Sequence, residues 1–268
     1  MPEGPEVRKI AESLAERVGE RDLLSYEILG GRYENHGPPE GFQELDSSLP
    51  AQIAGAGCHG KFIFLIFSGG SSLWCTLGMT GGWTRERETH SRIRFTLGDG
   101  EIFFTDSRNF GTIRFVSDRK MLIDKISSLG PDMLGEDVSD ERFFERIRSC
   151  KKKSIAQAVM DQKVIAGVGN YLKAETLYRS RISPHRACDS LSGEELSRLN
   201  TSIKTIIRDS YESGGATIQS YTGFNGKIGK YSRRFAVYNQ KEDPEGRKVI
   251  KEKTRDGRMT HWVPEIQR

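Results

Sequence analysis

The sequence predicts an α+β fold, in which an N-terminal β-sandwich with one helix is followed by a helical half that ends in short strands. Between residues 20 and 116, short apolar or alternating runs are separated by turn-forming residues, which is typical of strands. From residue 139 onward, apolar residues instead recur at helical spacing behind capping signals. This change of period indicates two structural regions.

The N-terminal half opens with a predicted helix, because apolar residues recur at helical spacing from Val7 to Val18. Phe62–Phe67 (FIFLIF) and Leu73–Leu77 are apolar runs on either side of a Ser-Gly-Gly-Ser turn, so we expect a hairpin of two buried strands. Arg92–Leu97 alternates and returns as EIFFTD, which predicts a second hairpin with one solvated face. Thr112–Val116 adds another strand.

In the C-terminal half, helix starts are predicted at four capping signals: Ser139, Ser154 with Gln157, Asn170, and Ser192 with Glu195. Ser127–Glu136 is rich in turn formers, and Phe235–Gln267 has the pattern of two or three short strands. We therefore expect a first domain over residues 1–130, a linker over 131–138 and a second domain over 139–268, with a stranded subregion from about residue 234.

Composition and charge narrow the class of protein. A net charge of +4 over 268 residues permits nucleic-acid binding without requiring it. The four cysteines are far apart and form no C-x-x-C pair, so they indicate neither a zinc site nor a redox pair, and they suit a reducing compartment. No apolar run has the pattern of a signal peptide or a membrane span. We expect an intracellular protein, in the nucleus or in the cytoplasm or nucleoid depending on its source.

The first seven residues, MPEGPEV, carry a candidate for covalent chemistry. Removal of the initiator Met would leave Pro2 as a secondary amine, and an α-amine has a reference pKa of about 8, well below that of lysine. An unprotonated amine is a nucleophile toward a sugar or carbonyl carbon, and Glu3 and Glu6 supply nearby carboxyl groups for proton transfer. The alternative is a frayed N-terminus followed by a helix.

Four separated stretches together resemble the formamidopyrimidine-DNA glycosylase / endonuclease VIII family of base-excision repair enzymes. They are Met1–Val7 in its endonuclease VIII form, Gly60-Lys61-Phe62, the helix–two-turn–helix stretch Met160–Glu175, and WVPEIQ at Trp262–Gln267. They follow the family's order and span nearly the whole chain.

This resemblance implies a catalytic set of Pro2, Glu3, Glu6 and Lys61. Pro2 would attack C1′ of the damaged nucleotide to form a Schiff base, Glu3 would move protons, and Glu6 would order the sugar or the nucleophile. For both glutamates, stabilisation of a helix dipole is the structural alternative.

The resemblance also implies that Lys61, Asn170 and Arg258 bind DNA phosphates. Residues Gly167-Val168-Gly169 would make a tight turn that DNA can approach, with the N–H groups of the following helix free for an anion. The alternatives are solvated charges for Lys61 and Arg258 and an ordinary N-cap for Asn170. Lys151–Lys153 is open to two interpretations, a further attraction to phosphate or a solvated charge run.

Met79, Arg108 and Phe110 match the family's trio that fills the hole left by an extruded nucleotide. Met and Phe can wedge between bases, and Arg can hydrogen-bond to the orphaned partner base. Core packing is the alternative for the two apolar members.

The C-terminus departs from the common family pattern of two C-x-x-C pairs. Glu245 and Lys248 align with the first pair, and Val263 and Ile266 with the second, so the sequence resembles the zincless-finger members. We expect Val263 and Ile266 to pack against Trp262 and Val249 in place of a metal, and we expect neither a metal nor an organic cofactor.

The sequence thus predicts a bifunctional DNA glycosylase and AP lyase that cleaves by β,δ-elimination, with damaged DNA as its partner and a monomeric state. The zincless resemblance favours oxidised pyrimidines and hydantoins, while 8-oxoguanine and the choice among duplex, bubble and single-stranded DNA stay open. The loop from Ala216 to Ser232 corresponds to the region that covers the extruded base in the family. A non-catalytic DNA binder and a terminal-proline tautomerase are the rival classes.

Overall fold

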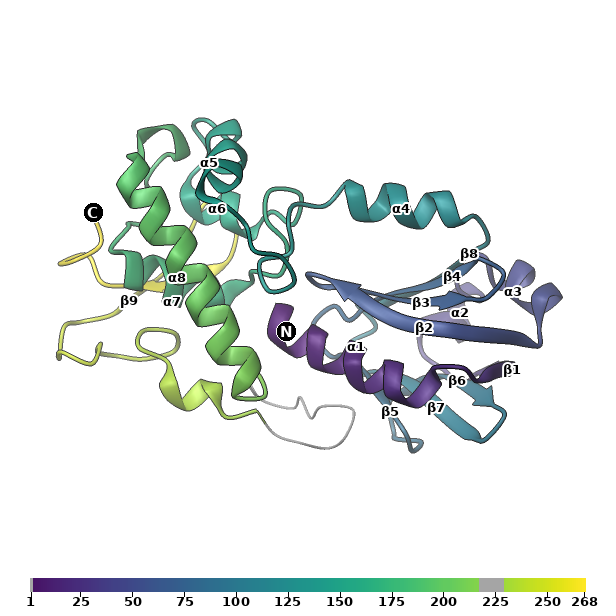
Figure 1. The fold of residues 1–268 in the computed structure, drawn as a ribbon. Helices are drawn as coiled ribbons and strands as arrows, with labels where there is room; N and C mark the ends of the chain where they lie inside the picture. Colours follow the sequence, from purple (N-terminus) through teal and green to yellow (C-terminus); the bar gives the residue numbers. More distant parts are fainter. Residues whose placement is uncertain (1, 217–228) are drawn as a thin grey trace. The chain divides into compact units, whose positions relative to one another are not determined.

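The computed structural model describes residues 2–216 and 229–268, and it divides the chain into two compact units (Figure 1). Among the described residues, unit 1 comprises Pro2, Glu6–Ser127 and Gly229. Unit 2 comprises Glu3–Pro5, Ser128–Ala216 and Lys230–Arg268. The segment 131–138, expected to be a linker, belongs to unit 2, and its Pro131, Asp132 and Met133 are buried.

Unit 1 is built on eight strands in the order β5-β7-β6-β1-β2-β3-β4-β8. Their bounds are β1 Asp22–Ile28, β2 Ala51–His59, β3 Phe62–Phe67, β4 Ser72–Thr76, β5 Gly81–Thr84, β6 Ser91–Leu97, β7 Gly100–Asp106 and β8 Thr112–Val116. The helices of this unit are α1 Gly4–Val18, α2 Arg32–His36, α3 Phe42–Ser48 and α4 Arg119–Ser127. Only two residue pairs join β1 to β2, and the strands on either side of this junction contribute to one core, which confirms the predicted β-sandwich.

The core of unit 1 explains why the N-terminal helix forms. Val7, Ile10, Leu14 and Val18 are each almost fully buried in one cluster with residues of both halves of the sandwich, such as Leu65. Because this apolar stripe recurs at helical spacing, α1 is stabilised by packing rather than by propensity alone.

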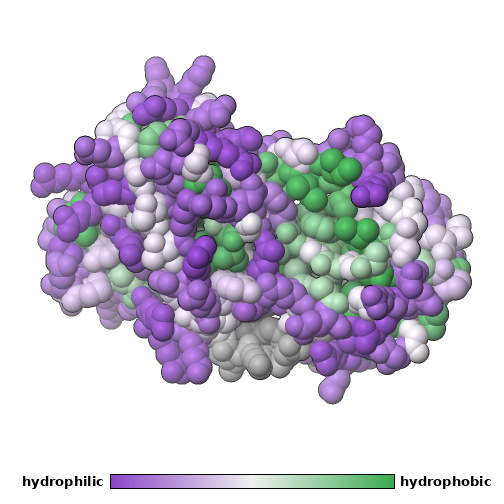
Figure 2. Space-filling view, viewed as in Figure 1, coloured by the Kyte–Doolittle hydropathy of each residue, from purple (hydrophilic) through white to green (hydrophobic). Residues whose placement is uncertain are grey.

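The FIFLIF strand is less buried than the sequence predicted. Phe62, Ile63, Leu65 and Phe67 are buried, whereas Phe64 and Ile66, which alternate with them, are only partly buried. Figure 2 shows hydrophobic side chains gathered on the surface over β2, β3, β4 and α4. The outer face of the sheet is only partly covered, which a continuous apolar run cannot reveal.

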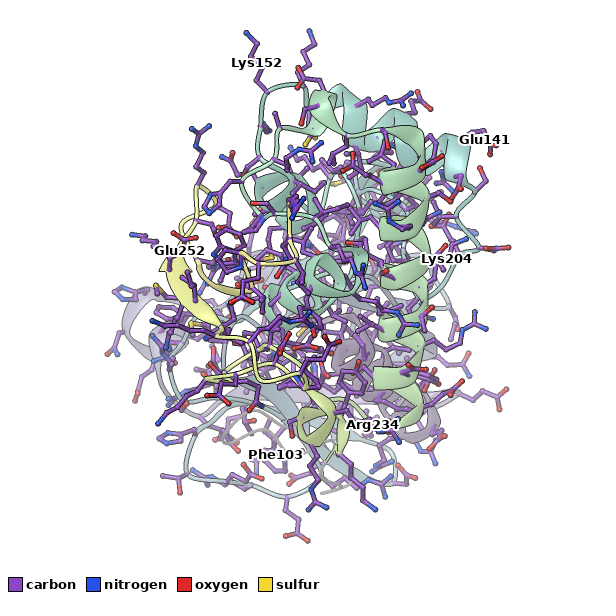
Figure 3. The ribbon with its side chains drawn as sticks, turned by 90° about the vertical axis from the view of Figure 1, so that its left-hand side faces the viewer. Phe103, Glu141, Lys152, Lys204, Arg234 and Glu252 are labelled. Atoms are coloured by element: carbon purple, nitrogen blue, oxygen red, sulfur yellow. The ribbon has the colours of Figure 1, made fainter. Side chains whose placement is uncertain are left out.

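Unit 2 carries the predicted helices and a small hairpin (Figures 1 and 3). Its elements are α5 Asp140–Ser149, α6 Ile155–Met160, α7 Asn170–Ser180, η1 Cys188–Ser190, α8 Gly193–Glu212, η2 Tyr231–Arg234, β9 Ile250–Lys253 and β10 Met259–Trp262. Figure 3 shows Lys204 on the long helix α8 and Glu252 on β9. The capping boxes at Ser154 and Ser192 and the Ser139 cap form as predicted.

Candidate functional site

Glu3 is buried against the start of helix α7 in unit 2. Its side chain is 3% exposed, Oε1 accepts a hydrogen bond from the Tyr171 amide at 2.9 Å, and Oε2 accepts one from the Leu172 amide at 3.2 Å. The carboxylate therefore caps α7 from a distant part of the chain, at the positive end of the helix dipole. Both of its oxygens are held in place by these amides, and Glu3 directly follows Pro2 in the chain.

Two glycines make this arrangement possible. A Cβ built on Gly169 would lie 2.2 Å from Cδ of Glu3, and a Cβ on Gly4 would lie 3.0 Å from Cα of Gly167. The Gly4 amide also donates to the Gly167 carbonyl at 2.8 Å. Gly169 is therefore required by the close approach of Glu3, and the predicted approach of DNA to this turn stays a prediction. The Tyr171 and Leu172 amides are occupied by the protein's own carboxylate.

Asn170 is the first residue of α7 rather than its cap, which corrects the predicted N-cap role. Gly169 occupies the cap position without a side-chain cap, because Glu3 supplies the acceptor instead. The Asn170 amide donates from Nδ2 to the Met259 carbonyl at 2.9 Å, and its buried Oδ1 has no hydrogen-bond partner. Asn170 thus ties α7 to the hairpin.

A buried ion pair that sequence reasoning missed joins α7 to the turn of the hairpin. Lys173 is fully buried and its Nζ lies 2.5 Å from Oδ2 of Asp256, whose side chain is 4% exposed. Oδ1 of Asp256 accepts from the Thr254 hydroxyl and from the Arg258 amide. The only available signal was a lysine inside the otherwise buried stretch YLKAET.

Arg258 itself is exposed at this turn, as expected for a residue that reaches a ligand. Its carbonyl accepts hydrogen bonds from Thr254, so the turn is closed on both sides of Asp256. Burial lowers the pKa of Lys173, while Asp256 and the charge of Glu3 oppose that decrease. Because Lys173 pairs with Asp256, and Asp256 accepts from the Arg258 amide, the position of Arg258 depends on a lysine that lies inside the protein.

Glu175, a second missed residue, holds the segment that precedes the hairpin. Its carboxylate accepts from the backbone amides of Ala236, Val237 and Tyr238 at 2.7 to 3.0 Å. Burial raises the pKa of Glu175, and these three hydrogen bonds oppose that increase. In the sequence, the only sign of this role was a glutamate within the mostly apolar helix stretch YLKAETLY.

The finger, residues 234–268, has an apolar cluster at the positions that align with cysteine pairs. Val263 is fully buried and packs with Ala174, Val237 and Val249, with Ile266 at the edge. Trp262 does not join them, which corrects one expectation, because its ring packs on His185 and its Nε1 donates to Glu252. These residues do not fit a zinc ion, and no group of three or more potential ligands occurs among residues 2–216 and 229–268.

The remaining catalytic candidates lie in unit 1. Pro2 and Glu6 are buried, Glu6 within the first turn of α1. Lys61 is partly buried in the turn that joins β2 to β3, next to Gly60 at φ 57°, which confirms its predicted place at the entry of a strand.

The trio Met79, Arg108 and Phe110 is brought together in unit 1 by two adjoining loops. Met79 is 37% and Phe110 54% exposed, and the Arg108 guanidinium lies 4.9 Å from the Phe110 ring centre. Such exposure does not fit core packing. Gly78, at φ 57°, packs so closely that a Cβ would lie 2.7 Å from the Phe110 backbone.

Asp106 shapes both of these loops. It is 1% exposed, and it accepts from the Thr80 hydroxyl at 2.5 Å, from the Gly111 amide at 2.6 Å and from the Arg108 amide at 3.2 Å. The exposed trio is therefore carried by a fixed scaffold. Sequence reasoning missed Asp106, although it stands directly before the loop in the sequence DSRNFG.

Comparison with known proteins gives the family. The formamidopyrimidine-DNA glycosylase N-terminal domain matches residues 1–113, the H2TH domain of that family matches 129–222, and its C-terminal domain matches 230–268. A formamidopyrimidine-DNA glycosylase of Roseiflexus sp. (strain RS-1) is 32% identical over the full length of both chains. That of Desulfitobacterium hafniense is 30% identical over 91% of this chain and 90% of its own.

Solved structures agree. The MutM (Fpg) protein of Thermus thermophilus superposes with a TM-score of 0.87 at 30% identity, covering 99% of this chain and 98% of its own. A Lactococcus lactis Fpg mutant in complex with Fapy-dG-containing DNA gives a TM-score of 0.88 at 27% identity over the whole of both chains. The chain belongs to the formamidopyrimidine-DNA glycosylase family, whose members are DNA-repair enzymes with glycosylase and AP lyase activity.

No helix among the described residues is long and apolar enough to cross a membrane.

Proposed function

We propose that this enzyme excises oxidised bases through a Schiff base on Pro2 and then cleaves the DNA strand by successive β- and δ-elimination. Damaged DNA is its substrate, as in the Lactococcus lactis complexes with Fapy-dG and with an AP site. The observation that best supports this chemistry is the placement of Glu3, whose two oxygens are fixed by the amides of α7 next to Pro2.

The reaction begins at the Pro2 nitrogen, which is an amine once Met1 has been removed. Its lone pair attacks C1′, the bond from C1′ to the base breaks, and the base leaves with a proton. The amine proton released in this step passes to Glu3, whose carboxylate is held in place by two hydrogen bonds from backbone amides. Glu3 then gives this proton to O4′ as the C1′–O4′ bond breaks, so the sugar ring opens and a positively charged iminium forms beside a carboxylate that stabilises it.

Strand cleavage follows from the acidity of the iminium. Loss of a proton from C2′ expels the 3′ phosphate, and a second elimination expels the 5′ phosphate, which leaves a one-nucleotide gap bounded by phosphates. Glu6 orders the nucleophile or the opened sugar. Lys61, which we place in this step and on a neighbouring phosphate, supplies a flexible point charge.

We further propose that Lys61, Asn170 and Arg258 bind phosphates, and that Met79, Arg108 and Phe110 replace the extruded nucleotide. The exposure of Arg258 and of the trio supports these roles. For Asn170 the support is indirect, since its Nδ2 holds Met259. Its effect on DNA binding would then pass through the finger.

The preferred lesions in this proposal are oxidised pyrimidines and hydantoins. The region expected to cover the base, Ala216 to Ser232, lies mostly outside the described residues. A panel of defined-lesion duplexes, bubbles and single strands, including Fapy-dG and 8-oxoguanine, scored for base release and strand cleavage, tests this preference. Faster release of 8-oxoguanine than of any pyrimidine or hydantoin lesion would reverse it.

Borohydride trapping tests the nucleophile. With Met1 removed, reduction should give a stable protein–DNA adduct on the N-terminal peptide, because the iminium is reducible. A variant with one residue retained ahead of Pro2 should bind lesion DNA without trapping, since its Pro2 nitrogen is an amide. Strong trapping by the blocked protein would instead point to a lysine, with Lys61 tested first. No trapping by the processed protein would favour a non-catalytic binder.

A further inference from the structure

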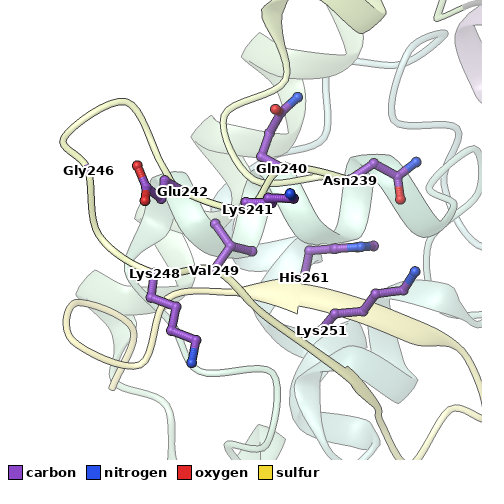
Figure 4. A pocket seen from close by; sticks show the side chains of 9 residues that line it. All are labelled: Asn239, Gln240, Lys241, Glu242, Gly246, Lys248, Val249, Lys251 and His261. Carbon is purple, nitrogen blue, oxygen red and sulfur yellow. The ribbon is translucent and has the colours of Figure 1, made fainter.

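The finger contains a pocket that none of the roles above uses. Its volume is about 600 Å³, within the range of ligand sites. It is lined by the segment 239–249, which leads into β9, and by one residue each of β9 and β10 (Figure 4). Lys241, Lys248, Lys251 and His261 line it together with Glu242. All of these residues belong to unit 2.

The pocket carries excess positive charge. Three lysines and one glutamate line it. No ion pair within the described ranges joins the ammonium group of Lys241, Lys248 or Lys251 to a carboxylate. Lys251 pairs across the hairpin with His261, so their side chains lie on the same face of the two strands, as Figure 4 shows. Several cations without an ion pair that line one pocket favour an anionic ligand.

His261 provides the second observation. The residue is 3% exposed, yet its Nδ1 is buried without any hydrogen-bond partner. A buried polar atom of this kind is costly unless something satisfies it. Since His261 lines the pocket, an occupant with an acceptor oxygen would accept a hydrogen bond from Nδ1–H.

The surroundings of His261 connect the pocket to the residues proposed to bind DNA. Its ring packs at 5.1 Å from that of Tyr238, and Met259, two residues earlier on β10, accepts the Asn170 hydrogen bond. We propose that the pocket binds a further backbone phosphate of the DNA, distinct from those assigned to Lys61, Asn170 and Arg258. This inference rests on the proposed function, because the phosphate belongs to the DNA substrate.

Binding at this site should take up a proton. Burial lowers the pKa of His261, and the charges of Lys251 on β9 and Lys173 on α7 lower it further, so the empty pocket disfavours the imidazolium. A phosphate beside Nδ1 favours the imidazolium and raises that pKa. The affinity should therefore increase as the pH falls from 8 to 6, and His261→Phe should lose this dependence.

Two measurements test the inference. In the first, binding of a duplex with a non-cleavable abasic analogue is followed against salt for the wild type, for Lys241→Ala/Lys251→Ala, and for Lys204→Ala, a lysine on α8 of the same unit. The pocket variant should reduce the slope of log K against log salt by about one, and Lys204→Ala should leave it unchanged. In the second, inorganic phosphate is titrated while the ring nitrogens of His261 are observed by NMR.

The two measurements together decide the source of the phosphate. A saturable shift of His261 that the double variant abolishes, together with the reduced slope, supports the proposal. A shift without any change of slope would assign the pocket to a free anion and overturn the DNA contact. No shift and no change of slope would exclude an anion site altogether. Base release by the wild type is measured separately, so failure of the proposed function would be recognised independently.

Discussion

Each unit has a buried carboxylate that holds a segment with candidate functional residues, but the hydrogen bonds of the two carboxylates span very different separations along the sequence. In unit 1, Asp106 accepts hydrogen bonds from residues 2, 5 and 26 positions away, so one carboxylate shapes two neighbouring loops. In unit 2, Glu3 accepts from amides 168 and 169 positions away. The first carboxylate is a local scaffold, whereas the second joins the N-terminal segment to a distant helix.

This difference suggests a structural role for Asp106 and a catalytic role for Glu3. The side chains that Asp106 positions are exposed, and Asp106 itself is buried behind them. Glu3 is equally buried, but it follows Pro2 directly in the chain. We therefore expect that altering Asp106 damages structure more than the chemical step, and that altering Glu3 does the reverse.

The largest expected effect is that of Glu3→Gln. The amide cannot accept a proton as the carboxylate does, so base release should fall by roughly 10²–10⁴-fold while DNA affinity stays within about threefold. Its NH2 group would also face a backbone amide of α7, which should cost about 1–3 kcal/mol of unfolding free energy, as for Asp106→Asn below. Single-turnover kinetics on a lesion duplex measure this. Cleavage at a preformed abasic site should be less affected, since the base has already gone.

Asp106→Asn is the matched control in unit 1. Its NH2 group would face backbone amides, which leaves buried donors unpaired and should cost about 1–3 kcal/mol of unfolding free energy. Base release at saturating enzyme should fall far less than for Glu3→Gln. If the two variants lost base release equally, the distinction between scaffold and chemistry would be wrong.

The next largest effect is expected for Gly169→Ala. The new Cβ would lie 2.2 Å from Cδ of Glu3 and must displace it, whereas Gly193→Ala at the start of α8 meets nothing closer than 3.7 Å. Because a displacement of about 1 Å can cost 10²-fold in rate, Gly169→Ala should lose about that much base release. Gly193→Ala should retain full activity, and a fully active Gly169→Ala would show that Glu3 need not stay on α7.

The sequence allowed much of this fold to be predicted, because most of it depends on local patterns. The capping boxes at Ser154 and Ser192 and the strand of Arg92–Leu97 rest on neighbouring residues, and they form as expected. The family followed from four motifs in the expected order. The residues assigned to catalysis and DNA binding remain predictions.

The parts that could not be predicted depend on partners far away in the chain. Asn170 looks like a cap in isolation, yet the acceptor at the start of α7 is Glu3. Lys173 and Asp256 resemble surface charges until the fold buries both. Helix α4 was missed because its pattern is weakly amphipathic, with only Leu122 buried.

The ion pair of unit 2 should contribute more to stability than an exposed pair of unit 1. Lys173→Met leaves Asp256 buried without its cation, which should cost about 3–5 kcal/mol in urea unfolding. Lys173→Met/Asp256→Asn should recover part of that loss. Lys120→Met removes the partner of Asp124 on α4, where both side chains are exposed, and should cause no measurable change. Equal losses for the two lysine variants would contradict the role of burial.

The last effects concern the buried thiols, one in each unit, and they show only at alkaline pH. Burial raises the pKa of Cys75 to about 12, helped by the charge of Asp106, and burial raises that of Cys188 to about 12. An unfolded thiol ionises from about pH 8.5, so between that pH and 12 the native state binds more protons than the unfolded state. The contribution of these thiols to the unfolding free energy is therefore fully present below pH 8.5. Above that pH the unfolding free energy decreases, by up to about 1.4 kcal/mol per pH unit for each thiol.

Cys75→Ala should flatten this decrease in unit 1, and Cys188→Ala should do so in unit 2. Buried tyrosines such as Tyr231, whose pKa burial raises to about 12, act in the same direction and remain in both variants. The quantity to measure is thus the difference between each variant and the wild type in unfolding free energy, from pH 8 to 10.5. Because the thiols lie in separate units, the two differences should add in the double variant. A difference that did not change with pH would show that neither thiol contributes to the alkaline loss.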